Sequence, residues 1–265
     1  MKSLLLIIGL IISLEAEAKM ITKVIEYKDG DATLEGYFAY DTAVKSPLAE
    51  KGKRPGIVVV HDWLGVGPYV KHRVEMLASL GYAAFAADIY GKGVRPNNPK
   101  DASATATIYK TNLKLMRERV NAALRELKKQ EVVSATNVAA MGYCFGGTTA
   151  LELARSGAPI KGVVSFHGGL GPQNPKDALN IKAKVLALHG ADDPFVKEEE
   201  VKAFEQEMRE AKVDWQLVKY SGAVHSFTNP EAGNDNSKGA AYNKSADERS
   251  WIAMKDFFAE IFPKQ

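Results

Sequence analysis

The sequence predicts a single α/β domain with a mostly parallel central sheet, helices on both faces and an antiparallel hairpin at one edge. Two observations predict it. Short apolar runs alternate along the chain with segments of helical period, which is typical of a parallel sheet covered by helices. Near the start, two strand-like segments (residues 23–27 and 32–38) flank the turn Asp29-Gly30-Asp31, and this arrangement predicts the hairpin.

The later strands are predicted by apolar runs without alternation, which suit strands buried on both faces. These runs are residues 56–60, 82–89, 138–143, 163–166 and 184–188. Between them, apolar residues recur at helical spacing. The predicted helices are residues 70–80, ending at the C-cap Gly81, and then 104–129, 148–155, 198–212 and 246–262.

Composition narrows the possible classes of protein. The chain has 265 residues, 46% of them hydrophobic and 25% charged, with a formal net charge of +3, which suits one sizeable globular domain. No run of Lys and Arg is dense enough for a nucleic-acid site, so we expect no nucleic-acid partner. The chain contains one cysteine, which excludes an intramolecular disulfide and a zinc site built from paired thiolates.

The first residues have the pattern of a targeting segment. A lysine precedes an apolar run (residues 4–14), and a small-x-small site ends at Ala18. The run is too short for a membrane span. We expect residues 1–18 to be a cleaved secretory signal, which makes residues 19–265 the domain and the protein periplasmic or secreted. The alternative is a cytoplasmic protein whose translation starts at Met20.

The main chemical motif is Gly142-Tyr143-Cys144-Phe145-Gly146-Gly147, between a buried strand and a short apolar helix. It matches the nucleophile elbow G-x-S-x-G with cysteine in place of serine. The sharp turn leaves room only for very small neighbours, so glycines flank the cysteine. The positive end of the following helix points at the sulfur and favours a thiolate. The backbone N–H of Phe145 is free to bind an oxyanion. The alternative reading is a buried cysteine in a tight glycine-rich turn.

Two later strand ends carry partners for this cysteine. Asp192-Asp193-Pro194 follows one strand, and His225 follows the last one. The order nucleophile, acid, histidine is that of the α/β-hydrolase fold, which is therefore our fold prediction. Asp192 and Asp193 compete for the acid position, and we favour Asp193 because Pro194 fixes the turn just beyond it. We expect Cys144, His225 and Asp193 to be catalytic.

These motifs, together with His225-Ser226-Phe227-Thr228-Asn229-Pro230, resemble the dienelactone hydrolase family of carboxymethylenebutenolidase-like proteins. The resemblance runs from about Ile21 to the C-terminus. It implies a triad in which Cys144 is the nucleophile, His225 the base and later the acid, and Asp193 the group that orients the histidine. It also implies an ester or lactone as the small-molecule substrate, a thioester intermediate and no metal or organic cofactor.

The resemblance extends to the loop after the third strand and to the substrate site. The Trp63 backbone N–H becomes the second oxyanion donor. Asp62 stands where the best-known members have a glutamate that contacts the cysteine. Those members hold a substrate carboxylate with two arginines, and here Lys92 and Asn229 stand nearest to those positions. Neither offers the arginine fork, so we expect no bidentate carboxylate clamp.

Some residues have two interpretations. Tyr90 and Phe227, like Trp63 and Phe195, lie beside strand-end motifs and either line an apolar pocket or pack in the core. His167 is expected to be a structural residue at a strand end.

The rival functions are a class I glutamine amidotransferase, although the His-x-Glu of those enzymes is missing, and an inactive binding protein on the same fold. Nothing in the sequence indicates an oligomeric state.

Overall fold

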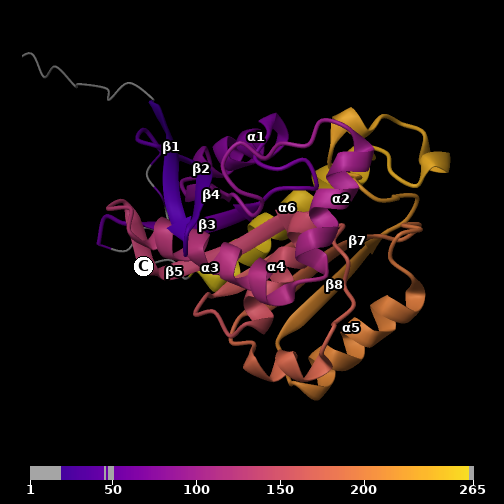
Figure 1. The fold of residues 1–265 in the computed structure, drawn as a ribbon. Helices are drawn as coiled ribbons and strands as arrows, with labels where there is room; N and C mark the ends of the chain where they lie inside the picture. Colours follow the sequence, from indigo (N-terminus) through magenta and orange to yellow (C-terminus); the bar gives the residue numbers. More distant parts are fainter. Residues whose placement is uncertain (1–18, 45, 47–50, 263–265) are drawn as a thin grey trace, which may run out of the picture.

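The structure is a computed structural model that describes residues 19–44, 46 and 51–262; the predicted secretory signal lies outside these residues. In the described chain, eight strands form one sheet in the order β1-β2-β4-β3-β5-β6-β7-β8 (Figure 1). The strands are β1 (Met20–Asp29), β2 (Ala32–Asp41), β3 (Arg54–Val60), β4 (Ala83–Ala87), β5 (Val133–Tyr143), β6 (Gly162–Phe166), β7 (Lys184–Gly190) and β8 (Trp215–Tyr220). Pairing is antiparallel for β1–β2 and β2–β4 and parallel elsewhere. The predicted mostly parallel sheet with an edge hairpin is confirmed.

Helices cover both faces of the sheet (Figure 1). They are α1 (Pro68–Ala78), α2 (Pro99–Lys110), α3 (Leu113–Lys128), α4 (Phe145–Arg155), α5 (Glu198–Glu210) and α6 (Lys244–Ile261), with short 3-10 turns η1 (Pro175–Asn180), η2 (Pro230–Ala232) and η3 (Asn236–Lys238). Strand β3 shows why both faces need cover. Val58 and Val60 pack into a core with α2 to α5, whereas Ile57 and Val59 pack into a second core with α1 and α6. Successive side chains of a strand point to opposite faces, so an uninterrupted apolar run fills two cores.

One predicted helix is wrong in its extent. The continuous pattern over residues 104–129 is two helices, α2 and α3, separated at Thr111 and Asn112. The Asn112 side chain accepts the N–H of Leu115 at 3.1 Å and so caps α3, a role that asparagine fills better than it fills a helix interior. The break lets α2 lie beside the strand ends near Cys144, where it lines a cavity described below.

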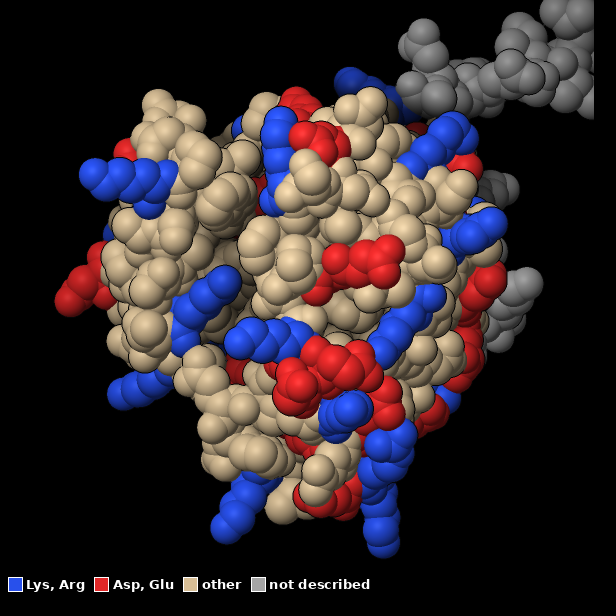
Figure 2. Space-filling view, turned by 90° about the vertical axis from the view of Figure 1, so that its right-hand side faces the viewer, with Lys and Arg blue, Asp and Glu red and all other residues tan. Residues whose placement is uncertain are grey.

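The surface facing right in Figure 1 carries charges of both signs. Figure 2 shows its Lys and Arg side chains interspersed with Asp and Glu around a hollow among uncharged side chains. This face is therefore neither uniformly positive nor uniformly negative. Among the described helices, none has the length and apolar character needed to cross a membrane.

Candidate active site

Cys144 lies on the sharp turn between β5 and α4, with φ of 55° and ψ of −118°. A non-glycine residue at positive φ is strained, and such strain persists only where the surroundings enforce it. The neighbouring glycines leave no room for side chains. A Cβ on Gly142 would lie 2.1 Å from the Gly146 carbonyl oxygen, and one on Gly146 would lie 2.2 Å from that of Val60. The turn therefore needs glycine at both positions.

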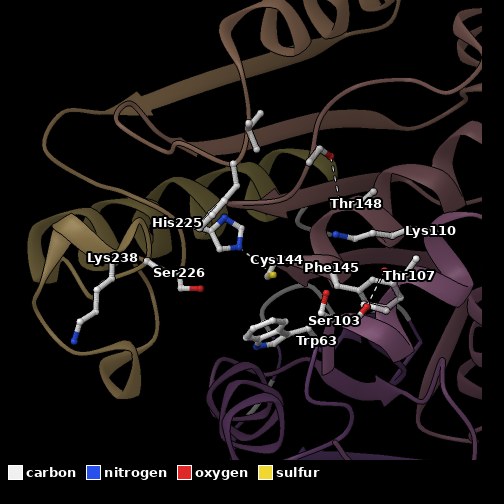
Figure 3. A pocket seen from close by; sticks show the side chains of 15 residues that line it. Trp63, Ser103, Thr107, Lys110, Cys144, Phe145, Thr148, His225, Ser226 and Lys238 are labelled. Carbon is white, nitrogen blue, oxygen red and sulfur yellow. Dashed lines mark hydrogen bonds between the residues drawn. The ribbon is translucent and has the colours of Figure 1, made fainter. Parts of the chain in front are cut away.

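Three side chains from the ends of three strands meet at this turn. His225, after β8, places Nε2 3.0 Å from the Cys144 sulfur and Nδ1 2.8 Å from Oδ2 of Asp193, after β7. The second Asp193 oxygen accepts the N–H of Phe195 at 2.8 Å. Figure 3 shows the imidazole facing the sulfur. Asp192, the competing acid, instead accepts the N–H of Gly222 at 3.1 Å, so Asp193 is the aspartate that contacts the histidine.

The electrostatics of His225 favour its protonated form. Burial lowers the pKa of His225, but the adjacent Cys144 sulfur and the Asp193 carboxylate outweigh burial and raise it to about 10. A protonated imidazole beside the sulfur is the counter-ion that a thiolate requires. The geometry therefore suits a pair in which an imidazolium faces the sulfur.

The sulfur opens into a cavity of about 450 Å³. Its apolar walls come from loops and helices around the strand ends: Trp63, Ala106, Phe145, Phe195, Val196 and Ala240. Two lysines also line it. Lys110, at the end of α2, directs its ammonium toward the space in front of Cys144, whereas Lys238 points away (Figure 3) and pairs with Asp235 at 3.7 Å. Lys110 has no ion-pair partner within the described chain, so it is free to meet an anionic group.

The expectation that Lys92 faces the substrate requires a correction. Lys92 does not line the cavity; its ammonium pairs with Glu26 on β1 at the exposed edge of the sheet. Sequence reasoning missed Lys110 because the predicted single helix hid the break that brings α2 to the cavity. Asn112, a good N-cap for a new helix two residues after Lys110, is the signal that could have found the break.

Tyr90 and Phe227 follow the core-packing alternative, and neither lines the cavity. Tyr90 packs against Phe145, with ring centroids 5.3 Å apart, and its hydroxyl donates to the Trp63 carbonyl at 3.2 Å. Phe227 is fully buried against the ring of His167, at a centroid distance of 5.1 Å. Tyr90 thereby fixes the loop that carries Trp63.

Asp62 is engaged within its own loop. Its Oδ1 accepts the N–H of Leu64 at 2.8 Å, and burial raises the pKa of Asp62 to about 6. No hydrogen bond joins it to Cys144 among the residues described here.

The N–H of Phe145, at the first position of α4, has no acceptor inside its helix. It is therefore available for an oxyanion.

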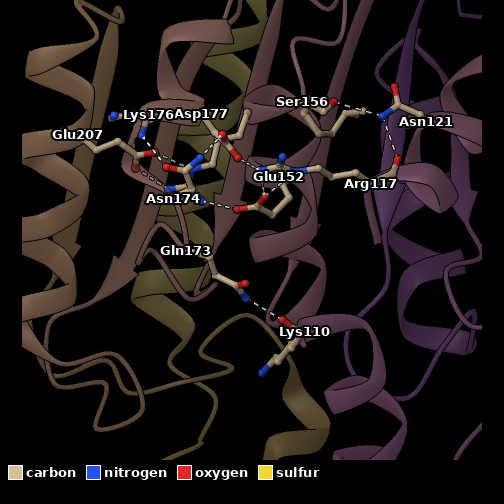
Figure 4. Close-up of polar contacts among 12 residues, drawn as sticks. Lys110, Arg117, Asn121, Glu152, Ser156, Gln173, Asn174, Lys176, Asp177 and Glu207 are labelled. Atoms are coloured by element: carbon tan, nitrogen blue, oxygen red, sulfur yellow. Dashed lines mark hydrogen bonds and ion pairs between the residues drawn. The ribbon is translucent and has the colours of Figure 1, made fainter. Parts of the chain in front are cut away.

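A buried ionic network holds α4 behind the turn (Figure 4). Arg155, at the end of α4, bonds Glu152 at 2.9 Å and Glu207 on α5 at 2.7 Å. Arg117 on α3 bonds Glu152 and Asp177 of η1, each at 2.6 Å. Paired charges of this kind are costly to break, because the remaining partner stays buried. The network therefore locks the helix whose first turn follows the cysteine.

Comparison with known proteins gives a consistent result. The sequence model of the dienelactone hydrolase family matches residues 40–262. A probable 2-oxo-3-(5-oxofuran-2-ylidene)propanoate lactonase from Bradyrhizobium sp is 30% identical over 188 residues, covering 66% of this chain and 74% of that protein. A crystal structure of a dienelactone hydrolase-like promiscuous phosphotriesterase from metagenomic libraries is 43% identical, with a TM-score of 0.85 over 92% of this chain and 99% of the other. The structure named m3DLH is 40% identical, with a TM-score of 0.86 and the same coverage.

Proposed function

The chain belongs to the dienelactone hydrolase family, and from that premise we propose that it hydrolyses carboxylic esters or lactones through Cys144, His225 and Asp193. The observation that carries the proposal is the continuous chain of contacts from sulfur to imidazole to carboxylate at the cavity. Nucleophile, base and orienting acid within hydrogen-bond reach of one another are the signature of covalent catalysis.

In the first half-reaction, the Cys144 thiolate attacks the carbonyl carbon. The oxyanion accepts the N–H groups of Phe145 and Trp63, each worth about 3–4 kcal/mol in comparable enzymes. When the adduct collapses, the carbon–oxygen bond to the leaving group breaks, and His225 gives its proton to that oxygen. The product of this step is a thioester plus an alcohol, or a ring-opened enzyme adduct when the substrate is a lactone.

In the second half-reaction, the same histidine becomes a base. His225 has already given its proton to the leaving oxygen. Because the thioester sulfur is uncharged, the interaction that most raises the pKa of His225 is lost, and the imidazole stays neutral. Neutral His225 then takes a proton from water, which attacks the thioester and regenerates the thiolate. Asp193 holds Nδ1–H throughout and so fixes the tautomer.

The cavity indicates which substrates fit. When the tetrahedral adduct collapses, the thiolate departs more readily than a poor leaving group such as an amine. Cleavage of enol lactones and activated esters is therefore favoured over cleavage of amides. Apolar walls and the ammonium of Lys110, which is unpaired within the described chain, suit a compact organic acid derivative with an anionic group. For Lys110→Met we expect a KM about fivefold higher for an anionic ester and unchanged for a neutral one, since one exposed ion pair is worth about 1 kcal/mol.

The triad is tested with Cys144→Ala and p-nitrophenyl acetate, an aryl lactone and glutamine as substrates. We expect the wild type to hydrolyse the first two and not glutamine, and the variant to lose about a thousandfold or more in kcat. Iodoacetamide should inactivate the wild type at neutral pH. A folded Cys144→Ala protein with full esterase activity would rule the proposal out, and an inert wild type would favour the binding-protein alternative.

A second activity is favoured by the 43% identity to a protein described as a promiscuous phosphotriesterase. Attack by Cys144 on a phosphotriester would form an S–P bond and expel the aryloxide, and the oxyanion donors would then bind the phosphoryl oxygen. Turnover requires that water, activated by His225, cleave the S–P bond and release a phosphodiester and the thiolate. We propose turnover of diethyl p-nitrophenyl phosphate, measured by p-nitrophenol release. A single burst without turnover would limit this reaction to inactivation.

A further inference from the structure

His167, at the end of β6, lies immediately behind the turn between β5 and α4 that carries Cys144, here called the nucleophile turn. Its side chain is wholly buried, and its φ is 40°. This conformation costs a non-glycine residue roughly 1–2 kcal/mol, so the surrounding contacts must hold it. The residue does not line the cavity and cannot contact the substrate there. Its contacts therefore concern other protein groups.

The two ring nitrogens of His167 link the nucleophile to a second segment. Nδ1 lies 3.1 Å from the backbone nitrogen of Cys144 and accepts its N–H, which the Phe166 carbonyl also accepts at 3.0 Å. Since Nδ1 accepts, Nε2 carries the hydrogen and donates to Oγ1 of Thr228 at 2.7 Å. Burial pushes the pKa of His167 well below its usual range, so the ring stays neutral and this tautomer is kept.

Thr228 is a fixed point in the loop that carries the catalytic histidine, three residues after His225. Its hydroxyl lies 2.6 Å from the Tyr69 hydroxyl. Its carbonyl accepts Arg73 at 2.5 Å, and Arg73 in turn pairs with Asp247 at 2.8 Å. The loop is thus anchored on the α1 and α6 side of the sheet, and His167 connects that anchor to the turn.

We propose that His167 is a positioning residue that joins the nucleophile turn to the His225 loop through Thr228 and so sets the sulfur–imidazole separation. The His167 ring also packs edge-on against the His225 ring, with centroids 5.3 Å apart. The connection runs from the turn after β5 to the loop after β8, the two segments whose side chains meet at the Cys144 sulfur. This inference rests on the proposed triad.

The connection is broken from either side with two variants. His167→Asn keeps an acceptor near the position of Nδ1 and tolerates positive φ, but its side chain is too short to reach Thr228. Thr228→Val removes the hydroxyl and keeps the shape. We expect each to lower kcat on p-nitrophenyl acetate about 10- to 100-fold, with KM within about twofold, because misplacement near 1 Å has effects of this size. The double variant should be no worse than the poorer single one.

The pH profile of Cys144 alkylation by iodoacetamide distinguishes positioning from a merely structural role. If the sulfur–imidazole contact loosens, the thiolate loses part of its counter-ion, and the profile moves to higher pH in both variants. Thr228→Ser, which keeps the hydroxyl, should restore wild-type behaviour. Thr149→Val is the matched control. This buried threonine bonds only the carbonyl of Phe145, at 2.9 Å, so its loss should leave the alkylation profile unchanged.

The outcomes separate this inference from the proposed function. If Cys144→Ala is inactive while His167→Asn and Thr228→Val keep wild-type kcat and alkylation profiles, the connection does not position the pair. Independent, additive losses in the double variant also contradict it. If His167→Asn fails to fold, the comparison of Thr228→Val with Thr228→Ser decides alone. Activity in Cys144→Ala would overturn the triad instead.

Discussion

Replacing Asp193 by asparagine tests the orientation of His225 most directly. The pKa of His225 is raised from 6.5 to about 10 against the effect of burial, so the interactions with Cys144 and Asp193 together exceed roughly 5 kcal/mol. Asp193 supplies the smaller part, about 2 kcal/mol, in the range of a charge-assisted hydrogen bond. Its loss therefore weakens the hold on the imidazole by about that amount.

The asparagine has a second effect. Its oxygen can still accept the N–H of Phe195, which turns its NH₂ toward Nδ1 of His225. The imidazole must then accept at Nδ1 and carry its hydrogen on Nε2, which is the wrong tautomer for a base. By analogy with other triads, we expect a loss of about a thousand- to ten-thousandfold in kcat/KM.

The assay is kcat/KM for p-nitrophenyl acetate at pH 7, with circular dichroism to establish folding. Asp192→Asn is the matched control, since Asp192 is exposed and bonds only the Gly222 N–H; its activity should stay within about twofold, as for ordinary surface substitutions. A folded Asp193→Asn protein with more than about a tenth of wild-type activity would refute this account of the triad.

Three further predictions concern pH and stability. The pKa of His225 is raised from 6.5 to about 10, so the stability that its ionic interactions contribute is complete below about pH 6.5 and is lost as pH rises through about 10. We expect kcat/KM to fall over the same alkaline range. A kcat/KM that stays constant to pH 11 would contradict the assignment. Arg155→Met should lower the free energy of unfolding in urea by about 3 kcal/mol, because Glu207 stays buried without its partner, whereas Glu152 keeps Arg117. A loss below about 1 kcal/mol would contradict this. Gly146→Ala should lower the free energy of unfolding by about 3 kcal/mol and abolish activity, because the added methyl group meets the Val60 carbonyl. Gly30→Ala, at a position with open space around it, should lower the free energy of unfolding by only about 1 kcal/mol, measured by thermal unfolding.

The sequence predicts the nucleophile turn well because the feature is local. A buried strand, a glycine-flanked cysteine and a helix follow within a few residues, and the steric need for glycine on both sides is recorded in the motif itself. The partners are predictable for another reason. The carboxyl ends of parallel strands lie at one edge of the sheet, so the strand order alone predicts Asp193 and His225 at the same place as Cys144.

The substrate-facing side chains were harder to predict because their direction depends on the path of the chain after each strand. Beyond β4, the Asp88 carboxylate accepts the N–H groups of Tyr90 and Gly91 at 3.1 and 3.0 Å, and Gly91 has φ of 116°. The chain therefore curls toward β1, which carries Lys92 to Glu26. Such a turn depends on contacts between distant segments, so periodicity does not reveal it.

The one cysteine on the strained turn has a consequence for oxidative stress. Peroxide converts a thiolate to a sulfenic acid, which many enzymes recover by forming a disulfide with a neighbouring thiol. This sequence contains no second cysteine, so a sulfenate on Cys144 could be rescued only by a thiol from another molecule. Without such a reductant, further oxidation of Cys144 to the sulfinic acid would inactivate the enzyme irreversibly.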